Sequence, residues 1–295
     1  MSEQQSIENK EVLTLEEASQ LFQVSTKTFL KLLREENIPA RKVGREWRFS
    51  KSALLQWMSE GNSRDYSLIE DQNQAYFEQV APVYDELRKG CYGNALREML
   101  IAKFTPKPGF EVADIGTGTG YLAHTLAQYA KKVWALDSSP AMLEVARKDF
   151  LSHNLNNVIL IEGDAHDLPL NDNSQDLVYA NLLLHHILEP SLAIKEMFRV
   201  VKPDGKAIIT DIDLHNYKWL KEEKSDLWLG FERAEIKGWL QEAGFTAIEV
   251  TDLGCNCRTS SKSGTLVEIP MFLAVGTKPP TIKRNKNNYN KEVNH

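Results

Sequence analysis

The sequence is poor in cysteine, in long apolar runs and in positive charge. Its 295 residues include three cysteines, an odd number that does not suggest a disulfide framework, so we expect free thiols. Nowhere do about eighteen apolar residues follow one another, which argues against a membrane-spanning helix. Residues 1–11 are polar and acidic and lack the pattern of a secretory signal. These absences predict a soluble, cytoplasmic protein with no membrane contact.

Length and net charge bear on the number of domains and on the way the protein could contact nucleic acid. A chain of 295 residues is long for one domain, so two domains are the better expectation. The formal net charge of -6 argues against a protein that coats nucleic acid along its whole surface. Any DNA contact must therefore come from a local basic patch.

Two closely spaced helix patterns stand near the start of the chain. Thr14 and Glu17 have capping-box spacing, and apolar residues then recur at helical period to about residue 22. Ser25 can cap a second helix that runs to about residue 37. Two helices joined so tightly predict a helix-turn-helix.

A basic hairpin pattern follows these helices. Residues 40–49 alternate apolar and polar side chains on both sides of Gly44, which is typical of a β-hairpin, or wing, and residues 51–58 predict a further helix. Residues 41–51 hold five basic side chains and one acidic one, a net of +4. The whole module, residues 11–60, resembles the excisionase and MerR-like winged helix-turn-helix family, most closely in the wing.

That resemblance implies a DNA-binding domain. In such modules the second helix enters the major groove and the wing meets the backbone. The residues expected to contact DNA are Ser25, Thr26, Lys27, Thr28, Lys31, Arg41, Lys42, Arg45 and Arg48. One small module binds DNA weakly, so a homodimer is expected, and a winged helix used for protein contact is the alternative.

The rest of the chain has a different periodicity. Residues 61–74 are polar, without apolar periodicity, and are interpreted as a linker. From residue 75 to 278 a helix over 76–87 precedes strands that alternate with helices, at 111–115, 132–136, 158–162, 177–180 and 206–211. This alternation predicts an α/β fold with a doubly wound, Rossmann-like parallel sheet. Strands at 246–252 and 268–276 are expected to pair antiparallel, and the tail at 279–295 is expected to be disordered.

A glycine-rich loop follows the first of these strands. Gly116, Gly118 and Gly120 lack β-carbons where the backbone must turn and approach a ligand, and Asp114 precedes them. Asp137 and Asp164 end the next strands, at the crevice where doubly wound sheets bind nucleotides. The loop contains no lysine, so a nucleoside without phosphates is favoured over a phosphate ligand.

At this point residues 76–278 resemble the class I S-adenosylmethionine-dependent methyltransferases, most closely the small-molecule branch with quinone-biosynthesis and arsenite methyltransferases. The segments Ala81–Asp85, Asn181–His186 and Val201–Gly205 also match that family in order. The resemblance implies S-adenosylmethionine as cofactor and a small-molecule methyl acceptor. It implies the cofactor-binding residues Tyr84, Asp114, Gly116, Thr117, Gly118, Gly120, Asp137, Ser138, Met142, Asp164, Ala165 and Asn181.

Two other enzyme classes share parts of this pattern. A dinucleotide-binding dehydrogenase has the glycine loop and the ribose acid, but the G-x-G-x-G spacing and Asp164 favour a methyltransferase. An exocyclic-amine DNA methyltransferase normally carries Pro-Pro-aromatic after the fourth strand, where Asn181 is followed by three leucines. A DNA base is therefore a poor acceptor candidate.

Several side chains could assist methyl transfer. Methyl transfer needs two reactants held in line, so no acid or base is compulsory. If the acceptor must lose a proton, His185, His186 and Asp211 are the catalytic candidates, with His215 nearby, and plain packing is the alternative for either adjacent histidine. Aromatic and apolar residues between Tyr217 and Phe231 stand where the family often builds its acceptor pocket.

The three cysteines suggest a more specific acceptor. Cys91, Cys255 and Cys257 are expected near the cofactor side of the sheet, and soft thiolates favour thiophilic ions such as As(III). Arsenite methylation is therefore an alternative, although the family's cysteine after the fourth strand is missing. Three unrelated thiols are the other interpretation.

The leading hypothesis is a small-molecule methyltransferase fused to a DNA-binding domain that regulates transcription. A regulator whose methyltransferase fold only senses S-adenosylmethionine or a metabolite is the rival, and the sequence motifs favour binding in both cases.

Overall fold

The computed structural model describes residues 10–35, 38–44, 46–60, 63–91 and 93–280. The chain forms two compact units, residues 1–69 and 70–295. Nearly all of the tail expected to be disordered lies outside the described residues. In the part of the chain that the structure describes, no helix combines the length and apolar character needed to cross a membrane.

The N-terminal unit has the predicted winged helix-turn-helix elements. The Thr14 hydroxyl accepts from the Glu17 N–H at 3.3 Å, and the Glu17 carboxylate accepts from the Thr14 N–H at 3.0 Å, so the predicted capping box is present. Phe29 and Phe49 pack edge to face in the core of this unit. Its elements are β1 (Val12–Leu13), α2 (Leu15–Leu21), α3 (Thr26–Glu35), β2 (Arg41–Val43), β3 (Glu46–Ser50) and α4 (Lys51–Glu60), with strand order β1-β3-β2.

The segment interpreted as a linker is helical. Helix α5 runs over Ser63–Val80, and the boundary between the two compact units, after residue 69, lies within it. Its sequence contains neither proline nor glycine and is rich in glutamate and glutamine, which are good helix formers. Near its end, Phe77 and Val80 pack against Ala81, Tyr84 and Met142. The helix expected at 76–87 is broken at Pro82, where the short helix η1 (Ala81–Val83) leads into α6 (Tyr84–Arg88).

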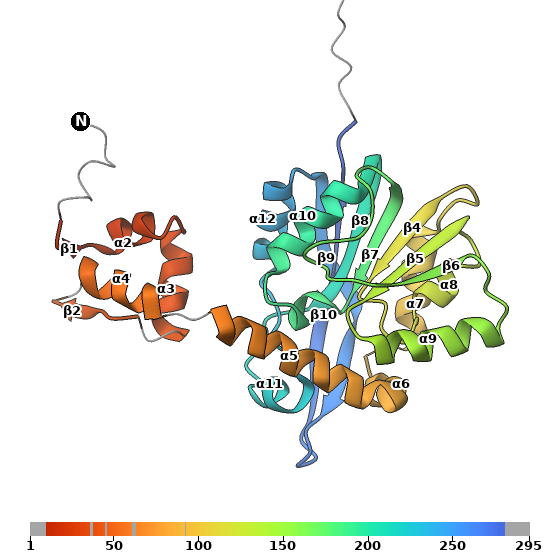
Figure 1. Ribbon diagram of the computed structural model, residues 1–295, viewed down its shortest axis with the longest axis horizontal. Helices are drawn as coiled ribbons and strands as arrows, with labels where there is room; N and C mark the ends of the chain where they lie inside the picture. Colours follow the sequence, from red (N-terminus) through yellow and green to blue (C-terminus); the bar gives the residue numbers. More distant parts are fainter. Residues whose placement is uncertain (1–9, 36–37, 45, 61–62, 92, 281–295) are drawn as a thin grey trace, which may run out of the picture. The chain divides into compact units, whose positions relative to one another are not determined.

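The second unit contains the predicted α/β sheet. The strands follow the order β6-β5-β4-β7-β8-β10-β9, in which β10 is antiparallel to both of its neighbours and the pairs from β6 to β8 are parallel (Figure 1). The expected antiparallel pair at the end of the chain is confirmed. The elements after α6 are α7 (Asn94–Phe104), β4 (Glu111–Ile115), α8 (Ala123–Leu126), β5 (Lys132–Asp137), α9 (Pro140–Ser152), β6 (Val158–Glu162), β7 (Gln175–Asn181), η2 (Leu184–His186), α10 (Pro190–Val200), β8 (Val201–Ile212), α11 (Trp219–Lys224), α12 (Arg233–Ala243), β9 (Thr246–Ser260) and β10 (Leu266–Thr277).

Helices cover both faces of this sheet. Successive side chains of a strand point to opposite faces, so Val112 of β4 packs with α7, α8 and α9, whereas Ala113 packs with α10 and α12. Figure 1 shows α10 and α12 together on one side of the sheet and α9 on the other. Covering both faces leaves the carboxyl ends of β4, β5 and β7 as the edge where polar residues gather.

Gly120 controls how closely the glycine loop approaches α9. Its φ is +89°, and a β-carbon there would lie 2.5 Å from Cζ of Phe150 and 3.2 Å from Cβ of Ala146. Both contacts belong to α9, so only glycine lets the loop and this helix pack as they do.

Replacing Gly120 with alanine should therefore destabilise the second unit. We expect Gly120→Ala to lower the free energy of unfolding by about 2–3 kcal/mol, because it adds a clash and a strained φ. Gly238 of α12 has no heavy atom within 4 Å of a built β-carbon, so Gly238→Ala should raise stability by about 0.5–1 kcal/mol. Urea unfolding of both variants tests this, and equal stability of Gly120→Ala and the parent would show that the close contact is not needed.

Candidate functional site

A large cavity opens at the carboxyl ends of β4, β5 and β7. It encloses about 920 Å³ of space that is open to solvent. Eleven of the twelve residues predicted to bind the cofactor line it: Tyr84, Asp114, Gly116, Thr117, Gly118, Asp137, Ser138, Met142, Asp164, Ala165 and Asn181. Residues that are far apart in the sequence therefore share one cavity.

Asp114 holds the glycine loop in shape. Its buried Oδ2 accepts a hydrogen bond from the Thr117 hydroxyl at 2.7 Å and another from the Ala123 N–H at 3.1 Å. Burial raises the pKa of Asp114 to about 7, against the lowering effect of these two hydrogen bonds. The carboxylate thus joins the end of β4 to both ends of the loop.

Asp137 fixes the opposite wall of the large cavity. Its Oδ2 accepts from the Gly118 N–H at 2.8 Å, and its Oδ1 accepts from the Ser139 N–H at 2.9 Å. Burial raises the pKa of Asp137, while these backbone donors act to lower it. A carboxylate has about four lone-pair positions, so two remain for ligand hydroxyls.

These features fit the nucleoside part of S-adenosylmethionine. A β-carbon on Gly116 would lie 2.5 Å from Cδ1 of Leu183, so backbone alone forms this wall. The loop brings no lysine, and Asp137 offers acceptors for two ribose hydroxyls. Asp164 lies at the far end, where its Oδ1 accepts from the backbone N–H of His166 at 2.9 Å.

Gly120 is the one predicted cofactor residue that does not line the large cavity. It serves the packing against α9 described above, and its role toward the cofactor stays a prediction. Asp85, named above only as part of a family-matching segment, also contributes: its Oδ1 accepts from the Thr119 hydroxyl at 2.6 Å. This bond ties the glycine loop to α6.

A small cavity of about 260 Å³ adjoins the large one through the shared residue Leu182. Its polar side chains include Arg88, His185 and Asp226, and the aliphatic ones are Leu182, Ile212, Leu220 and Ile269. Leu182 has a φ of +52°, an uncommon conformation for leucine, and its N–H donates to the Thr210 carbonyl at 2.8 Å. A strained residue held by β8 therefore separates the two cavities.

His185 and Asp211 form a buried pair beside the small cavity. The ring Nδ1 donates to Oδ1 of Asp211 at 2.7 Å, and Nε2 lies 3.9 Å from Oδ1 of Asp226, another residue lining the cavity. Burial lowers the pKa of His185, but the charge and hydrogen bond of Asp211 outweigh it and raise the pKa above its ordinary value. This is the arrangement of a histidine that can take up a proton at Nε2.

His186 faces the large cavity and has a different environment. Its Nε2 accepts from the Arg88 guanidinium at 2.9 Å, so its proton lies on Nδ1, which donates to the Ser225 carbonyl at 3.2 Å. Burial, followed by the nearby charges of His185 and Arg88, holds the pKa of His186 well below its ordinary value. His186 is therefore a neutral residue that positions Arg88.

The remaining acceptor-side expectations need correction. Trp228 and Phe231 pack in the core between the sheet and α10, and Trp219 packs on the opposite face, so the predicted aromatic acceptor pocket is wrong. The spacing of these aromatic residues in the sequence fits packing in the core as well as it fits a pocket. His215 lines neither cavity. Arg88 and Asp226 are buried charged residues of this site that no local sequence motif indicates.

The cysteines do not form three free thiols. Cys91 and Cys257 are joined by a disulfide across 166 residues of sequence, and Cys255 is free. The expectations that all three remain thiols and that all three can hold As(III) are therefore wrong for two of them. Strand β9 and the turn after α6 also exchange a hydrogen bond, from the Arg258 N–H to the Gly90 carbonyl at 3.2 Å. Both links hold Arg88 beside the small cavity.

In the N-terminal unit, the structure describes part of the predicted DNA surface. Ser25, Thr26, Thr28, Arg41 and Lys42 are exposed. Arg48 is partly exposed and pairs with Glu46 at 2.5 Å. Arg45 and the side chains of Lys27 and Lys31 lie outside the described residues.

Comparisons with known proteins agree with this division. A family described as "Methyltransferase domain" matches residues 113–209, and one described as "Helix-turn-helix domain" matches residues 12–62. The ubiquinone/menaquinone biosynthesis C-methyltransferase of Cupriavidus necator is 33% identical over 184 residues, which cover 58% of this chain and 70% of that protein. The YcgJ protein of Bacillus subtilis shares the fold, with a TM-score of 0.54 at 19% identity over 64% of this chain and 100% of that one.

The rice 2-methyl-6-phytyl-1,4-hydroquinone methyltransferase 1 (Oryza sativa) is also similar, at 33% identity over 50% of this chain. The match covers 44% of that protein, so the chain spans about half the length of several curated relatives.

The geometry of Asp137 predicts a binding defect on its substitution. Asp137→Asn removes the charge and one hydrogen-bond acceptor, so S-adenosylhomocysteine should bind about 10- to 100-fold more weakly, because hydrogen bonds to charged groups contribute about 1.5–3 kcal/mol. Isothermal titration calorimetry measures this. Asp172, exposed and paired with Arg199, provides the matched control Asp172→Asn, which should bind as the parent does. Equal affinity in both variants would remove the ribose role from Asp137.

Proposed function

Because the chain belongs to the S-adenosylmethionine-dependent methyltransferase family that includes the quinone-biosynthesis C-methyltransferases, we propose that it methylates a small molecule bound beside Leu182, where the large cavity adjoins the small one. The cofactor is S-adenosylmethionine, held in the large cavity by the residues that line it. The observation that carries the proposal is the contact between the two cavities at Leu182.

The residues around the small cavity favour an acceptor that directs an ionisable hydroxyl on a compact apolar ring toward them. Aliphatic side chains form much of its wall, and Arg88 supplies a positive charge that can balance an oxyanion. Its enclosed room suffices for little more than one water molecule, so the ring of the acceptor lies in the adjoining large cavity and only its hydroxyl meets the small one. A phenol or hydroquinone ring matches this combination, and the rice relative is named for a hydroquinone.

His185 is the proposed proton acceptor. When bound, S-adenosylmethionine supplies an electrophilic methyl group on a sulfonium and leaves as the neutral thioether. His185 takes the hydroxyl proton at Nε2, which makes the acceptor oxygen, or a ring carbon conjugated to it, nucleophilic. Asp211 holds the ring through Nδ1 and stabilises the imidazolium, and Arg88 stabilises the acceptor anion.

The pH dependence of the rate tests this assignment. His185 must be neutral to accept a proton, so kcat should rise with pH through a midpoint above about 6.5, because the pKa is raised. Asp211→Asn removes the group that raises the pKa while burial still lowers it, so the midpoint should move to lower pH and the plateau rate should fall by about 10- to 100-fold.

The control is Asp172→Asn, which removes a carboxylate from the surface instead. The dependence of its kcat on pH should coincide with that of the parent. If Asp211→Asn kept the parental midpoint, His185 would not be the group that titrates.

We further propose that the N-terminal unit binds DNA and thereby regulates transcription, as a homodimer. The helix-turn-helix match and the exposed side chains of Arg41 and Lys42 on β2 support this proposal. Both side chains can contact phosphates, and the second helix α3 would present Ser25, Thr26 and Thr28 at its start. Methylation and DNA binding then reside in separate units of one chain.

Arg41→Ala combined with Lys42→Ala should weaken DNA binding at every sequence. Each lost phosphate contact should reduce the slope of log affinity against log salt by about 0.9. Gel shifts at several salt concentrations with DNA from upstream of the gene measure the slope. Lys131→Ala, an exposed lysine of the second unit, is the control. An unchanged slope in the double variant would exclude the wing as a phosphate contact.

A further inference from the structure

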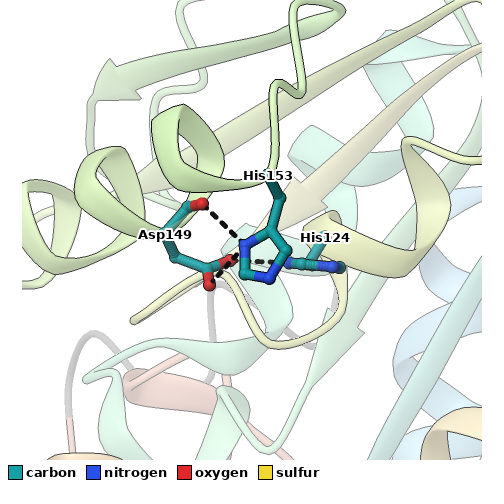
Figure 2. A group of neighbouring side chains, drawn as sticks. All are labelled: His124, Asp149 and His153. Atoms are coloured by element: carbon teal, nitrogen blue, oxygen red, sulfur yellow. Dashed lines mark hydrogen bonds and ion pairs between the residues drawn. The ribbon is translucent and has the colours of Figure 1, made fainter.

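A second group of potential ligands lies away from both cavities, on the surface where α8 and α9 meet. His124 of α8 and His153 at the end of α9 both face the carboxylate of Asp149 (Figure 2). The Nδ1 of His124 lies 2.6 Å from Oδ2, and the Nδ1 of His153 lies 3.1 Å from Oδ1. We propose that these three residues form a binding site for a divalent transition metal, with Zn²⁺ as the ion to test.

The chemistry of the three side chains fits such an ion. Two imidazole nitrogens and one carboxylate oxygen are ligands that zinc accepts, and a solvent molecule can take a fourth position. One ligand atom from each residue lies within 4.8 Å of the others. Zinc lies about 2.0–2.2 Å from each ligand atom, which places two ligand atoms of a tetrahedral site about 3.3–3.6 Å apart. Each imidazole nitrogen would therefore have to move away from the Asp149 oxygen by less than about 1 Å.

Both histidines can present Nδ1 to an ion once the ring proton moves to Nε2. Without an ion, Nδ1 of His124 donates to the Asp149 carboxylate, and Nδ1 of His153 also lies 2.9 Å from the backbone carbonyl of Asp149 and 3.0 Å from Oγ of Ser152. A neutral imidazole that binds metal through Nδ1 carries its proton on Nε2, and no described group forms a hydrogen bond with Nε2 of either ring. The side chains are 23% exposed for His124, 36% for Asp149 and 54% for His153, so an ion can reach them from solvent.

The buried group His185, His186 and Asp226 has similar spacing but does not fit a metal. Arg88 donates to Nε2 of His186, which places the proton on Nδ1, the atom that would face the ion. The raised pKa of His185 also favours a proton on its own Nε2, the atom that faces Asp226. The two groups therefore differ at Nε2: Arg88 prevents Nε2 of His186 from carrying the proton, whereas no described group forms a hydrogen bond with Nε2 of His124 or His153.

A metal at the surface site would link α8, which follows the glycine loop, to α9, which borders the large cavity. The His124 N–H donates to the Gly120 carbonyl at 2.9 Å, directly at the glycine loop. Asp149 and His153 lie on the same helix as Met142, which lines the large cavity. The ion would thus fasten the loop that follows β4 to α9.

Asparagine substitutions separate metal binding from hydrogen bonding. The side-chain N–H of asparagine can replace Nδ1–H as a donor to Asp149 but is a poor zinc ligand, so His124→Asn with His153→Asn should keep the local structure. Calorimetry with Zn²⁺ on the chelator-treated full chain should show one binding site. The double variant should lower the Zn²⁺ affinity by more than about 100-fold, because loss of a group that only contacts a metal ligand already lowers metal affinity about 10- to 100-fold. Zn²⁺ should also raise the melting temperature of the parent but not that of the variant.

His166→Asn is the matched control, because His166 pairs with Asp164 at 2.8 Å without a second histidine, and its Zn²⁺ affinity should equal that of the parent. If the double variant fails to fold, Asp149→Asn tests the same site by removing the shared carboxylate. Parental affinity in the folded double variant or in Asp149→Asn would overturn the proposal, as would the absence of stoichiometric Zn²⁺ binding by the parent.

Discussion

The buried carboxylate of Asp114 holds the site together. It accepts from Thr117 near the start of the glycine loop and from the first residue of α8, so one side chain sets the shape of the loop. The loop then presents the Gly118 N–H to Asp137, which completes the wall of the large cavity. An apolar replacement of Asp114 would leave those two donors without their partner in the core of the fold.

Local patterns in the sequence were enough to predict the strands and the large cavity. The ends of β4 and β6 match the predicted bounds, and the acids at strand ends meet because parallel strands end at one edge. The role of Gly120 was not predictable in this way. Its glycine is required by Phe150, thirty residues later, and periodicity carries no information on that contact.

The small cavity depends on contacts between distant parts of the chain. Arg88 comes from α6, His185 from the turn after β7, and Asp226 from the segment before α12. None of the three stands in a motif that indicates its partner, although His185 and Asp211, which share a hydrogen bond, were both among the catalytic candidates. The cysteines illustrate the same limit, because sequence alone could not show that Cys91 and Cys257 meet.

The central claim is that a small hydroxylated ring is methylated beside Leu182. Incubation of the full chain with methyl-labelled S-adenosylmethionine and a panel of phenols and hydroquinones tests this claim most directly. The account predicts label in at least one ring and one equivalent of S-adenosylhomocysteine for each methyl group transferred. Tight cofactor binding with no label in any acceptor would contradict it, and would favour a protein that only senses the cofactor.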